Sequence, residues 1–378
     1  MPINPSGIPL NREIYGPQPL RLTATNFKYA VLGVFLVAYI ATTFIIFFQL
    51  VIPTFNDNST SEVFAVDSTV YTYFADTIRE GRPDPWVLES LASFPNTLWV
   101  PTFISLVLKS PLLIMLFNYG LFAVSLAIYR RSSPIALTVF IPLLLLNPTT
   151  TTSILCVNKE IVDFFELALF LSWQKTRRRK FLLAAMLLAL FNRYELCVVM
   201  GIIVLAESHL NPLRKHRLAT LLSLTLALNF VMPVWGAKNL ALRFEEAQYA
   251  GVVRALDEMQ LHYMYVLVVL PKIADNFFGF LFNPGVWTAS TSWLLINFFN
   301  NFATAIVLLV LLVRRSLKLR NDLIYFAGIG AVMVAQALAV QPRYFYFVYV
   351  LLCLQAAQIA PERDRALARN GLADAVTI

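Results

Sequence analysis

The sequence predicts an all-α, polytopic membrane protein with about ten transmembrane helices. Of its 378 residues, 58% are hydrophobic and only 14% are charged, and the mean hydropathy is +0.66. A soluble domain does not need that much apolar surface, so the bilayer is the expected solvent. The first apolar stretch begins near Lys28 and has no small-residue cleavage site behind it, so we expect a retained helix rather than a signal peptide.

Apolar runs separated by charged or proline-containing breaks define the individual spans. Several of them are shorter than the roughly 20 residues that cross a bilayer. Such short helices would either use polar flanks or line a cavity in which water replaces lipid at one end. The predicted spans are 29–52, 111–129, 134–147, 160–174, 180–192, 195–208, 218–236, 293–313, 322–340 and 343–360.

Every second loop between these spans is basic, beginning with the amino-terminal segment. Because Lys and Arg are enriched in cytoplasmic loops, this alternation predicts that both termini lie in the cytoplasm, with a bacterial inner membrane as the expected location. The net charge of +8 arises in these loops, and no nucleic-acid partner is expected. Basic clusters occur at Arg12–Lys28, Arg130–Arg131, Lys175–Lys180, Arg214–Arg217, Arg314–Arg320 and Arg363–Arg369.

We expect a single integral-membrane domain, 1–378, whose first long loop, 53–110, lies outside the cytoplasm. Within this loop, 67–80 and 85–108 are predicted to be amphipathic helices. Aromatic and aliphatic side chains on their apolar sides are suited to the headgroup layer of the membrane.

The second external segment, 237–292, is predicted not to cross the membrane. A single crossing there would place the basic cluster at Arg314 outside and break the alternation. Its apolar stretch 262–282 is interrupted by Pro271, Lys272 and Asp275, so we expect an interfacial or re-entrant segment. A two-span hairpin in the same place would preserve the alternation equally well.

The first external loop offers a carboxylate, Asp67, soon after the first span. In a helix, Asp67 and Tyr71 share one face because they are four positions apart. Such a carboxylate could act as general base on an acceptor hydroxyl or as a ligand of a divalent cation, Mg²⁺ or Mn²⁺. The alternative is a helix N-cap, which Asp before an amphipathic run suits well.

The predicted fourth span opens with a charged stripe. Lys159, Asp163 and Glu166 follow i, i+4, i+7 spacing and therefore lie on one helix face, with Glu160 beside them. Charges at membrane depth avoid lipid, so this face marks a polar interior. Glu160 and Asp163 are candidate catalytic carboxylates, and Lys159 is a candidate substrate-binding cation. The structural alternative is an internal Lys159–Asp163 pair that positions the helix.

Two arginines lie at the predicted outer ends of spans, Arg193 in a short turn and Arg343 directly after Pro342. A guanidinium stays protonated and binds phosphate oxygens in a bidentate way. Snorkelling to the interface explains many arginines at span ends, but cations are scarce at outer ends. We therefore expect both to bind a phosphate or pyrophosphate, with Tyr344 available to stack on a sugar ring.

The absence of several well-known sequence motifs narrows the range of possible functions. The chain has no P-loop, GxSxG, HExxH or EF-hand pattern, which argues against a nucleotide-driven pump or a membrane protease. Cys156, Cys197 and Cys353 lie in apolar segments without metal-ligand spacing. We therefore predict neither a cysteine-bound metal nor a disulfide.

The layout resembles the integral-membrane glycosyltransferases of the GT-C superfamily and the related bacterial O-antigen and exopolysaccharide polymerases. Enzymes of this kind use sugars linked to polyprenyl phosphate or pyrophosphate and work on the non-cytoplasmic face. The resemblance rests on an Asp-x-x-x-Tyr (Asp67, Tyr71) in a long loop after the first span, an Asn147-Pro148 break before Asn158-Lys159-Glu160, an Arg193-Tyr194 turn, and Arg343-Tyr344 opening the last span.

By this resemblance, Asp67 would be the first-loop carboxylate that serves as base or metal ligand, and Arg193 and Arg343 would hold the lipid phosphate. The motif has a single Asp rather than an acidic pair, which keeps the metal-independent polymerase branch in contention. The resemblance implies transfer of a sugar or glycan from a polyprenyl-(pyro)phosphate-linked donor to a glycan, lipid or protein acceptor, or the joining of repeat units.

Two other classes remain open. A transporter or flippase of a lipid-linked glycan would show inverted repeats and matched broken helices, which we do not find in the sequence. A non-enzymatic scaffold of a polysaccharide-assembly machine would not need ionic groups facing inward.

Overall fold

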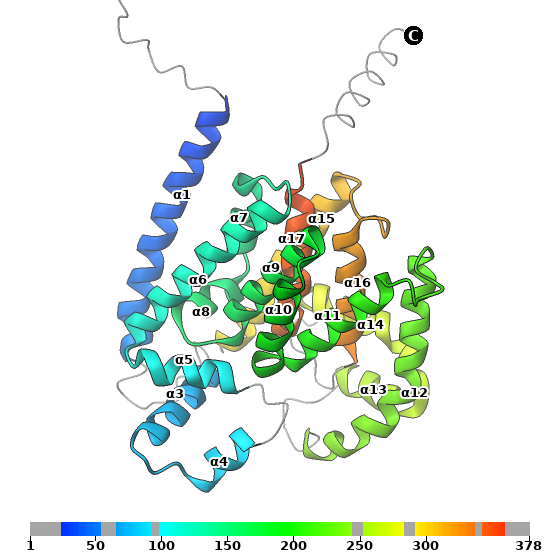
Figure 1. The fold of residues 1–378 in the computed structure, drawn as a ribbon, viewed down its shortest axis with the longest axis horizontal. Helices are drawn as coiled ribbons and strands as arrows, with labels where there is room; N and C mark the ends of the chain where they lie inside the picture. The colour runs from blue at the N-terminus through cyan, green and yellow to red at the C-terminus, as the bar shows by residue number, and fades with distance from the viewer. Residues whose placement is uncertain are drawn as a thin grey trace, which may run out of the picture. The chain divides into compact units, whose positions relative to one another are not determined.

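The computed structural model describes residues 24–53, 66–92, 98–243, 252–282, 292–336 and 342–359 (Figure 1). Regular secondary structure in those segments is all helical, which confirms the predicted fold class, and their one strand-like feature is an isolated bridge between Ile135 and Gln358. The chain divides into two compact units, Met1–Thr42 and Thr43–Ile378. The first contains the beginning of helix α1 (Ala24–Ile46), and the other described elements belong to the second.

Two helices of the described segments are long and apolar enough to cross a membrane, Asn26–Val51 and α6 (Pro111–Ser132). The first consists of most of α1 and the π-helical turn η1 (Phe47–Val51). These helices agree with the predicted spans at 29–52 and 111–129. Four of the other eight predicted spans correspond to shorter apolar helices, so the prediction of ten spans is not confirmed. These four are 218–236, 293–313, 322–340 and 343–360.

The expected span at 134–147 is instead the first arm of a bent pair. Helix α7 (Leu137–Leu145) is followed by α8 (Pro148–Leu155), and the two are bent by 81°. Asn147 causes the break, because its side chain accepts a hydrogen bond from the Thr149 backbone N–H at 2.9 Å and caps the new helix. Pro148 follows at the first helical position, where a missing N–H costs nothing.

Helix α9 (Lys159–Thr176) lies inside the second unit and is buried on almost every side (Figure 1). It packs against α6, α8, α10 (Arg179–Asn192) and α17 (Tyr346–Ala357). A helix that is apolar around most of its circumference is stable only when it is enclosed in this way. Three of its carboxylates, Glu160, Asp163 and Glu166, are buried along with its apolar side chains.

Helices α10 and α11 (Tyr194–Glu207) form a hairpin with a single residue, Arg193, between them. The Arg193 backbone is extended, with φ −153° and ψ 89°, which ends one helix and starts the next. Both helices agree closely with the predicted elements at 180–192 and 195–208.

The carboxy-terminal half packs further helices around this core. Thr149 Oγ1 of α8 donates to Asn300 Oδ1 at 2.9 Å and so ties α8 to this half of the chain. The elements are α12 (Arg217–Arg243), α13 (Val252–Met259), η2 (Gln260–Met264), α14 (Tyr265–Phe282), α15 (Ser292–Val313), α16 (Asp322–Ala335) and the 3-10 turn η4 (Pro342–Phe345), which leads into α17.

The break in the helix predicted within 262–282 occurs at a different position from the one expected. Helix α14 continues through Pro271, whereas non-helical backbone occurs earlier, at His262 and Tyr263, where Tyr263 has φ 62°. Lys272 does not interrupt the helix because it is buried in an ion pair with Asp257 of α13 at 2.5 Å.

The described parts of the loop 53–110, predicted to be external, are mostly helical, and two helices follow α3. Helix α3 (Val66–Arg79) agrees with the prediction for 67–80. The single helix expected over 85–108 is instead α4 (Pro85–Ala92) and α5 (Trp99–Leu108). The sequence between them contains Pro95, which disfavours helix at the residue before it. Residues 93–97, including Phe94 of the predicted apolar side, lie outside the described segments.

Candidate functional site

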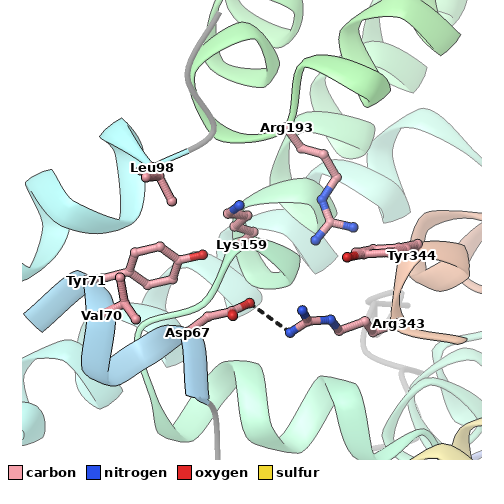
Figure 2. A pocket seen from close by; sticks show the side chains of 8 residues that line it. All are labelled: Asp67, Val70, Tyr71, Leu98, Lys159, Arg193, Arg343 and Tyr344. Carbon is pink, nitrogen blue, oxygen red and sulfur yellow. Dashed lines mark hydrogen bonds and ion pairs between the residues drawn. The ribbon is translucent and has the colours of Figure 1, made fainter. Parts of the chain in front are cut away.

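A cavity of about 230 Å³ opens where α3, the residue before α5, the start of α9, the α10–α11 turn and η4 converge (Figure 2). Six of its eight lining residues belong to the motifs that the sequence singled out. The two others, Val70 and Leu98, are apolar and were not predicted. Val70 could have been found, because it lies three residues after Asp67 on the same helix face. The lining residues are Asp67, Val70, Tyr71, Leu98, Lys159, Arg193, Arg343 and Tyr344.

Helix α3 brings Asp67 and Tyr71 to the same wall, as their spacing predicts. The helix begins at Val66, so Asp67 lies inside its first turn rather than at the N-cap position. The positive end of the helix dipole still stabilises a carboxylate at that position. The Tyr71 ring is buried, and burial together with the charges of Asp67 and Glu160 raises the pKa of its phenol above the ordinary value. Tyr71 therefore acts as a neutral hydrogen-bonding group.

Lys159 is the first residue of α9, and its side chain lies beside the Tyr71 ring in the cavity (Figure 2). The helix starts there because the Asn158 side chain accepts a hydrogen bond from the Lys159 backbone N–H at 2.9 Å. The Lys159 ammonium lies 5.8 Å from the centre of the Tyr71 ring, within range of a cation–π contact. Lys159 therefore lines the cavity, and its role in substrate binding stays a prediction.

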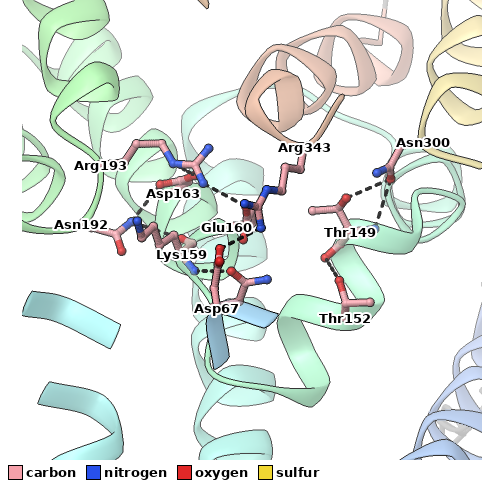
Figure 3. Close-up of polar contacts among 11 residues, drawn as sticks. Asp67, Thr149, Thr152, Lys159, Glu160, Asp163, Asn192, Arg193, Asn300 and Arg343 are labelled. Atoms are coloured by element: carbon pink, nitrogen blue, oxygen red, sulfur yellow. Dashed lines mark hydrogen bonds and ion pairs between the residues drawn. The ribbon is translucent and has the colours of Figure 1, made fainter. Parts of the chain in front are cut away.

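Arg193 is held from behind by two buried carboxylates of α9 (Figure 3). Its Nη2 is 2.9 Å from Glu160 Oε1, and its Nε is 3.2 Å from Asp163 Oδ2. Burial disfavours the charged guanidinium, but Asp163 and Glu160 outweigh it and hold the pKa of Arg193 above its ordinary value. Within the described residues, Nη1 of Arg193 has no hydrogen-bond partner, so one donor remains available beside the cavity.

Asn192, the residue before Arg193, completes this arrangement. Its Nδ2 donates to Asp163 Oδ1 at 2.8 Å and to the Lys159 backbone carbonyl at 3.2 Å. Asp163 is thus bonded to both Asn192 and Arg193. Tyr194, the second residue of the Arg193-Tyr194 turn, does not line the cavity.

Glu160 and Asp163, predicted as catalytic, therefore lie behind Arg193 and not at the cavity wall. Glu166, one turn further along α9, is completely buried. The three carboxylates of the stripe therefore form a supporting layer beneath the cavity, whereas Lys159 lines it.

Arg343 lies on η4 and points at the first turn of α3, where its Nη1 is 2.7 Å from Asp67 Oδ2 (Figure 2). Each of these two side chains retains nearly a third of its exposure, 31% for Arg343 and 32% for Asp67. The Tyr344 ring lies between the two arginines, 5.5 Å from the Arg343 guanidinium and 5.7 Å from that of Arg193. Cation–π contacts with one ring therefore keep the two guanidinium groups on the same side of the cavity.

The cavity wall is electropositive. Three cations, Lys159, Arg193 and Arg343, face a single carboxylate, Asp67, which gives the wall a formal charge of three minus one, or +2. Guanidinium and ammonium groups gathered in this way bind phosphate oxygens through charge-assisted hydrogen bonds. The arrangement can bind an anion and place it next to one carboxylate and two phenols.

The side chains do not fit a divalent cation. Within the described residues, no three His, Cys, Asp or Glu side chains gather into a group that could hold a metal ion. Asp67, the candidate ligand, is instead paired with a guanidinium. A cation there would have to displace Arg343 and would find a single carboxylate.

Comparisons with known proteins add no family assignment. The chain matches no protein-family profile, no curated protein and no solved structure at a significant level.

Proposed function

We propose that this protein is an integral-membrane glycosyltransferase that moves a sugar or glycan from a polyprenyl-(pyro)phosphate-linked donor to an acceptor. The observation that carries the proposal is the cavity in which Lys159, Arg193 and Arg343 converge beside the carboxylate of Asp67. A binding module for phosphate needs the cations alone. A transferase also needs a base beside them, and Asp67 is suitably placed for that task.

The size of the cavity supports a headgroup ligand. At about 230 Å³ it is smaller than the pockets that enclose whole drug-sized molecules, and it holds a phosphate or pyrophosphate more readily than a complete saccharide. The polyprenyl chain would then remain in the lipid, and the sugar would extend from the cavity toward the acceptor. Val70 and Leu98 provide an apolar edge to the cavity, compatible with the first carbons of a lipid.

The proposed topology has ten spans, both termini in the cytoplasm and the cavity on the periplasmic or exterior face. Its support is the position of the cavity residues in the basic-loop pattern. Asp67 follows the first predicted span, Lys159 opens the fourth, Arg193 lies between the fifth and sixth, and Arg343 opens the last. Convergence of these four segments on one cavity is what a common membrane side requires.

The reaction is a displacement at the anomeric carbon. The acceptor hydroxyl oxygen forms a bond to that carbon while the bond from the carbon to the phosphate oxygen breaks. The electron pair of the broken bond leaves with the lipid phosphate, whose charge Lys159 and the arginines stabilise. The hydroxyl proton passes to the carboxylate of Asp67.

This proposal follows the resemblance to the GT-C glycosyltransferases and polysaccharide polymerases described above. A single-sugar transferase and a repeat-unit polymerase share the same step and differ only in the length of the transferred glycan. Acceptors of three kinds, a glycan, a lipid or a protein, can present the required hydroxyl group.

The proposal is tested with purified protein in proteoliposomes that contain lipid-linked saccharides extracted from membranes of the producing organism. We expect release of the polyprenyl phosphate or pyrophosphate together with a heavier acceptor, detected by mass spectrometry. Vesicles without protein provide the control. Movement of the intact lipid-linked glycan across the bilayer, without cleavage, would instead identify a flippase.

A further inference from the structure

The two arginines of the cavity are bound in different ways. Arg193 is 8% exposed and contacts two carboxylates that are themselves at most 1% exposed. Arg343 contacts one carboxylate, and both members of that pair retain nearly a third of their exposure. Breaking the first arrangement would leave two buried charges uncompensated, whereas water or a ligand can replace the second contact.

We propose that Arg343 exchanges partners: it binds Asp67 in the empty site and a ligand phosphate oxygen in the loaded site, which releases Asp67 to act as base. This inference rests on the proposed function, because it takes a phosphate group as the ligand and an acceptor hydroxyl as the proton donor. Arg193 keeps its two carboxylates throughout and is a positioning residue for the cavity. The sequence alone suggested equal roles for the two arginines.

The surroundings of Arg343 suit this exchange. Its Nε has no hydrogen-bond partner within the described segments, so the guanidinium has unused donor capacity while it is bound to Asp67. The Tyr344 ring lies 5.5 Å away and can hold the cation near the same place after Asp67 is released. The ligand would replace one charge-assisted contact by another, and a phosphate can accept two parallel hydrogen bonds where Asp67 now accepts one.

Asp67, in turn, stays in place when its partner leaves. It lies in the first turn of α3, and that helix is fixed by the buried side chains of Tyr71, Phe74 and Ala75. The freed carboxylate would therefore face the bound phosphate from a fixed position. A base that is masked until the donor binds does not compete for acceptor protons in the empty site, so the exchange imposes an order: donor first, deprotonation second.

The exchange makes a prediction that a permanent ion pair does not. If Asp67 competes with the ligand for Arg343, its removal strengthens anion binding while it abolishes turnover. We would measure the affinity of the full-length protein in detergent for inorganic pyrophosphate by calorimetry. The forms compared are the wild type, Asp67→Asn, Arg343→Gln and the double variant. The control is Asp322→Asn, which removes the carboxylate of a different arginine pair, Arg217–Asp322.

We expect Asp67→Asn to bind pyrophosphate about fivefold more tightly than the wild type, since it removes one partly exposed competing ion pair. Arg343→Gln should bind it weakly, and the double variant should behave like Arg343→Gln, because Asp67 has no effect once its partner is absent. Asp322→Asn should match the wild type. Circular dichroism and gel filtration of each form establish that it is folded.

Three results would overturn the exchange: unchanged or weaker binding by Asp67→Asn, tighter binding that persists in the double variant, or no pyrophosphate binding by any form. The second would mean that Asp67 acts through its charge on the whole cavity. The transferase proposal has a separate outcome. If the affinities follow the expected order but no glycan is transferred from lipid-linked donors, the exchange stands and the transferase assignment fails.

Discussion

Arg343 donates a hydrogen bond from Nη1 to Oδ2 of Asp67 at 2.7 Å, although the two residues are 276 positions apart in the chain. The contact joins the first turn of α3 to the short turn that precedes the last helix. It brings the candidate base and a candidate phosphate-binding cation within hydrogen-bond distance of each other. The roles of both residues therefore have to be tested together.

Substitution of Asp67 separates a structural from a chemical role. A residue in the first turn of a helix needs only a short polar side chain, so Asn or Ser would cost little stability. A base needs the ionised carboxylate, so we expect Asp67→Asn to lower turnover by a factor of about 10²–10⁴. The measurement is the steady-state rate with lipid-linked donor at saturation, which reports the loss in the transition state.

Near-normal turnover by Asp67→Asn would limit Asp67 to a structural role in the helix and shift the search for a base to Glu160 and Asp163.

A chelator distinguishes a general base from a metal ligand at Asp67. We expect activity to be indifferent to EDTA, because the side chains around Asp67 do not form a divalent-cation site. Loss of activity that Mg²⁺ or Mn²⁺ restores would make Asp67 a metal ligand.

Arg193 is expected to matter for stability more than Arg343 does. Arg193→Gln leaves Glu160 and Asp163 buried without their cation, which should lower the free energy of unfolding by about 3–5 kcal/mol. Its matched control is Arg217→Gln, which breaks a more exposed pair with Asp322 and should cost about 1 kcal/mol or less. Denaturant unfolding in detergent micelles measures both. Equal costs for the two variants would contradict the supporting role of Arg193.

Restoring the charge balance gives a more specific test of the same arrangement. Adding Glu160→Gln and Asp163→Asn to Arg193→Gln removes the uncompensated charges, so the combined variant should regain a large part of the lost stability. A combined variant that is less stable than Arg193→Gln alone would show that the carboxylates support the fold through other contacts.

Glu166 is expected to be replaceable by its neutral isostere. The carboxyl group is fully buried and lies one turn from Asp163, which forms an ion pair with Arg193. An additional buried charge would be costly, so we infer that Glu166 is held in the neutral form. Glu166→Gln should shift the thermal midpoint by less than about 3 °C.

Glu160→Gln serves as the comparison, because it removes a charge that Arg193 does bind, and its midpoint should fall further. If Glu166→Gln is the more destabilised of the two, the carboxylate of Glu166 is ionised in the folded protein and has a cationic partner.

The proposed topology is tested by cysteine labelling. In a variant without its native cysteines, single cysteines at positions 60 and 250 should react with an impermeant thiol reagent added from outside. Both positions lie outside the described residues. Cysteines at 178 and 317, in basic loops, should react only after the membrane is opened. Labelling of position 178 from outside would reverse the proposed orientation of the cavity.

Local features were the predictable part of this structure. Helices with strong apolar runs occur close to where the sequence predicts them, as α3, α10 and α11 do. Spacing also predicted that Asp67 and Tyr71 would share a wall, because positions four apart lie on one helix face. The Asn147-Pro148 break was visible in the sequence, but the 81° bend that follows from it was not.

Tertiary pairing was beyond what the sequence could show. Nothing local indicates that Arg193 binds Glu160 and Asp163, 33 and 30 positions earlier, or that Arg343 meets Asp67. The sequence alone makes Asp67, Glu160 and Asp163 all catalytic candidates, whereas in the structure Glu160 and Asp163 lie behind Arg193. The kink at His262 and Tyr263 also has no local signal, since neither residue is a glycine or a proline.

The most direct measurement of the central claim is donor cleavage by Arg343 variants in the proteoliposome assay. We expect the wild type to release the polyprenyl phosphate or pyrophosphate, and Arg343→Ala to insert and purify normally but release none above the protein-free background. Arg343→Lys should recover little, because an ammonium cannot make the bidentate contact of a guanidinium. Donor cleavage by Arg343→Ala at the wild-type rate would contradict the assignment of this cavity as the site of transfer.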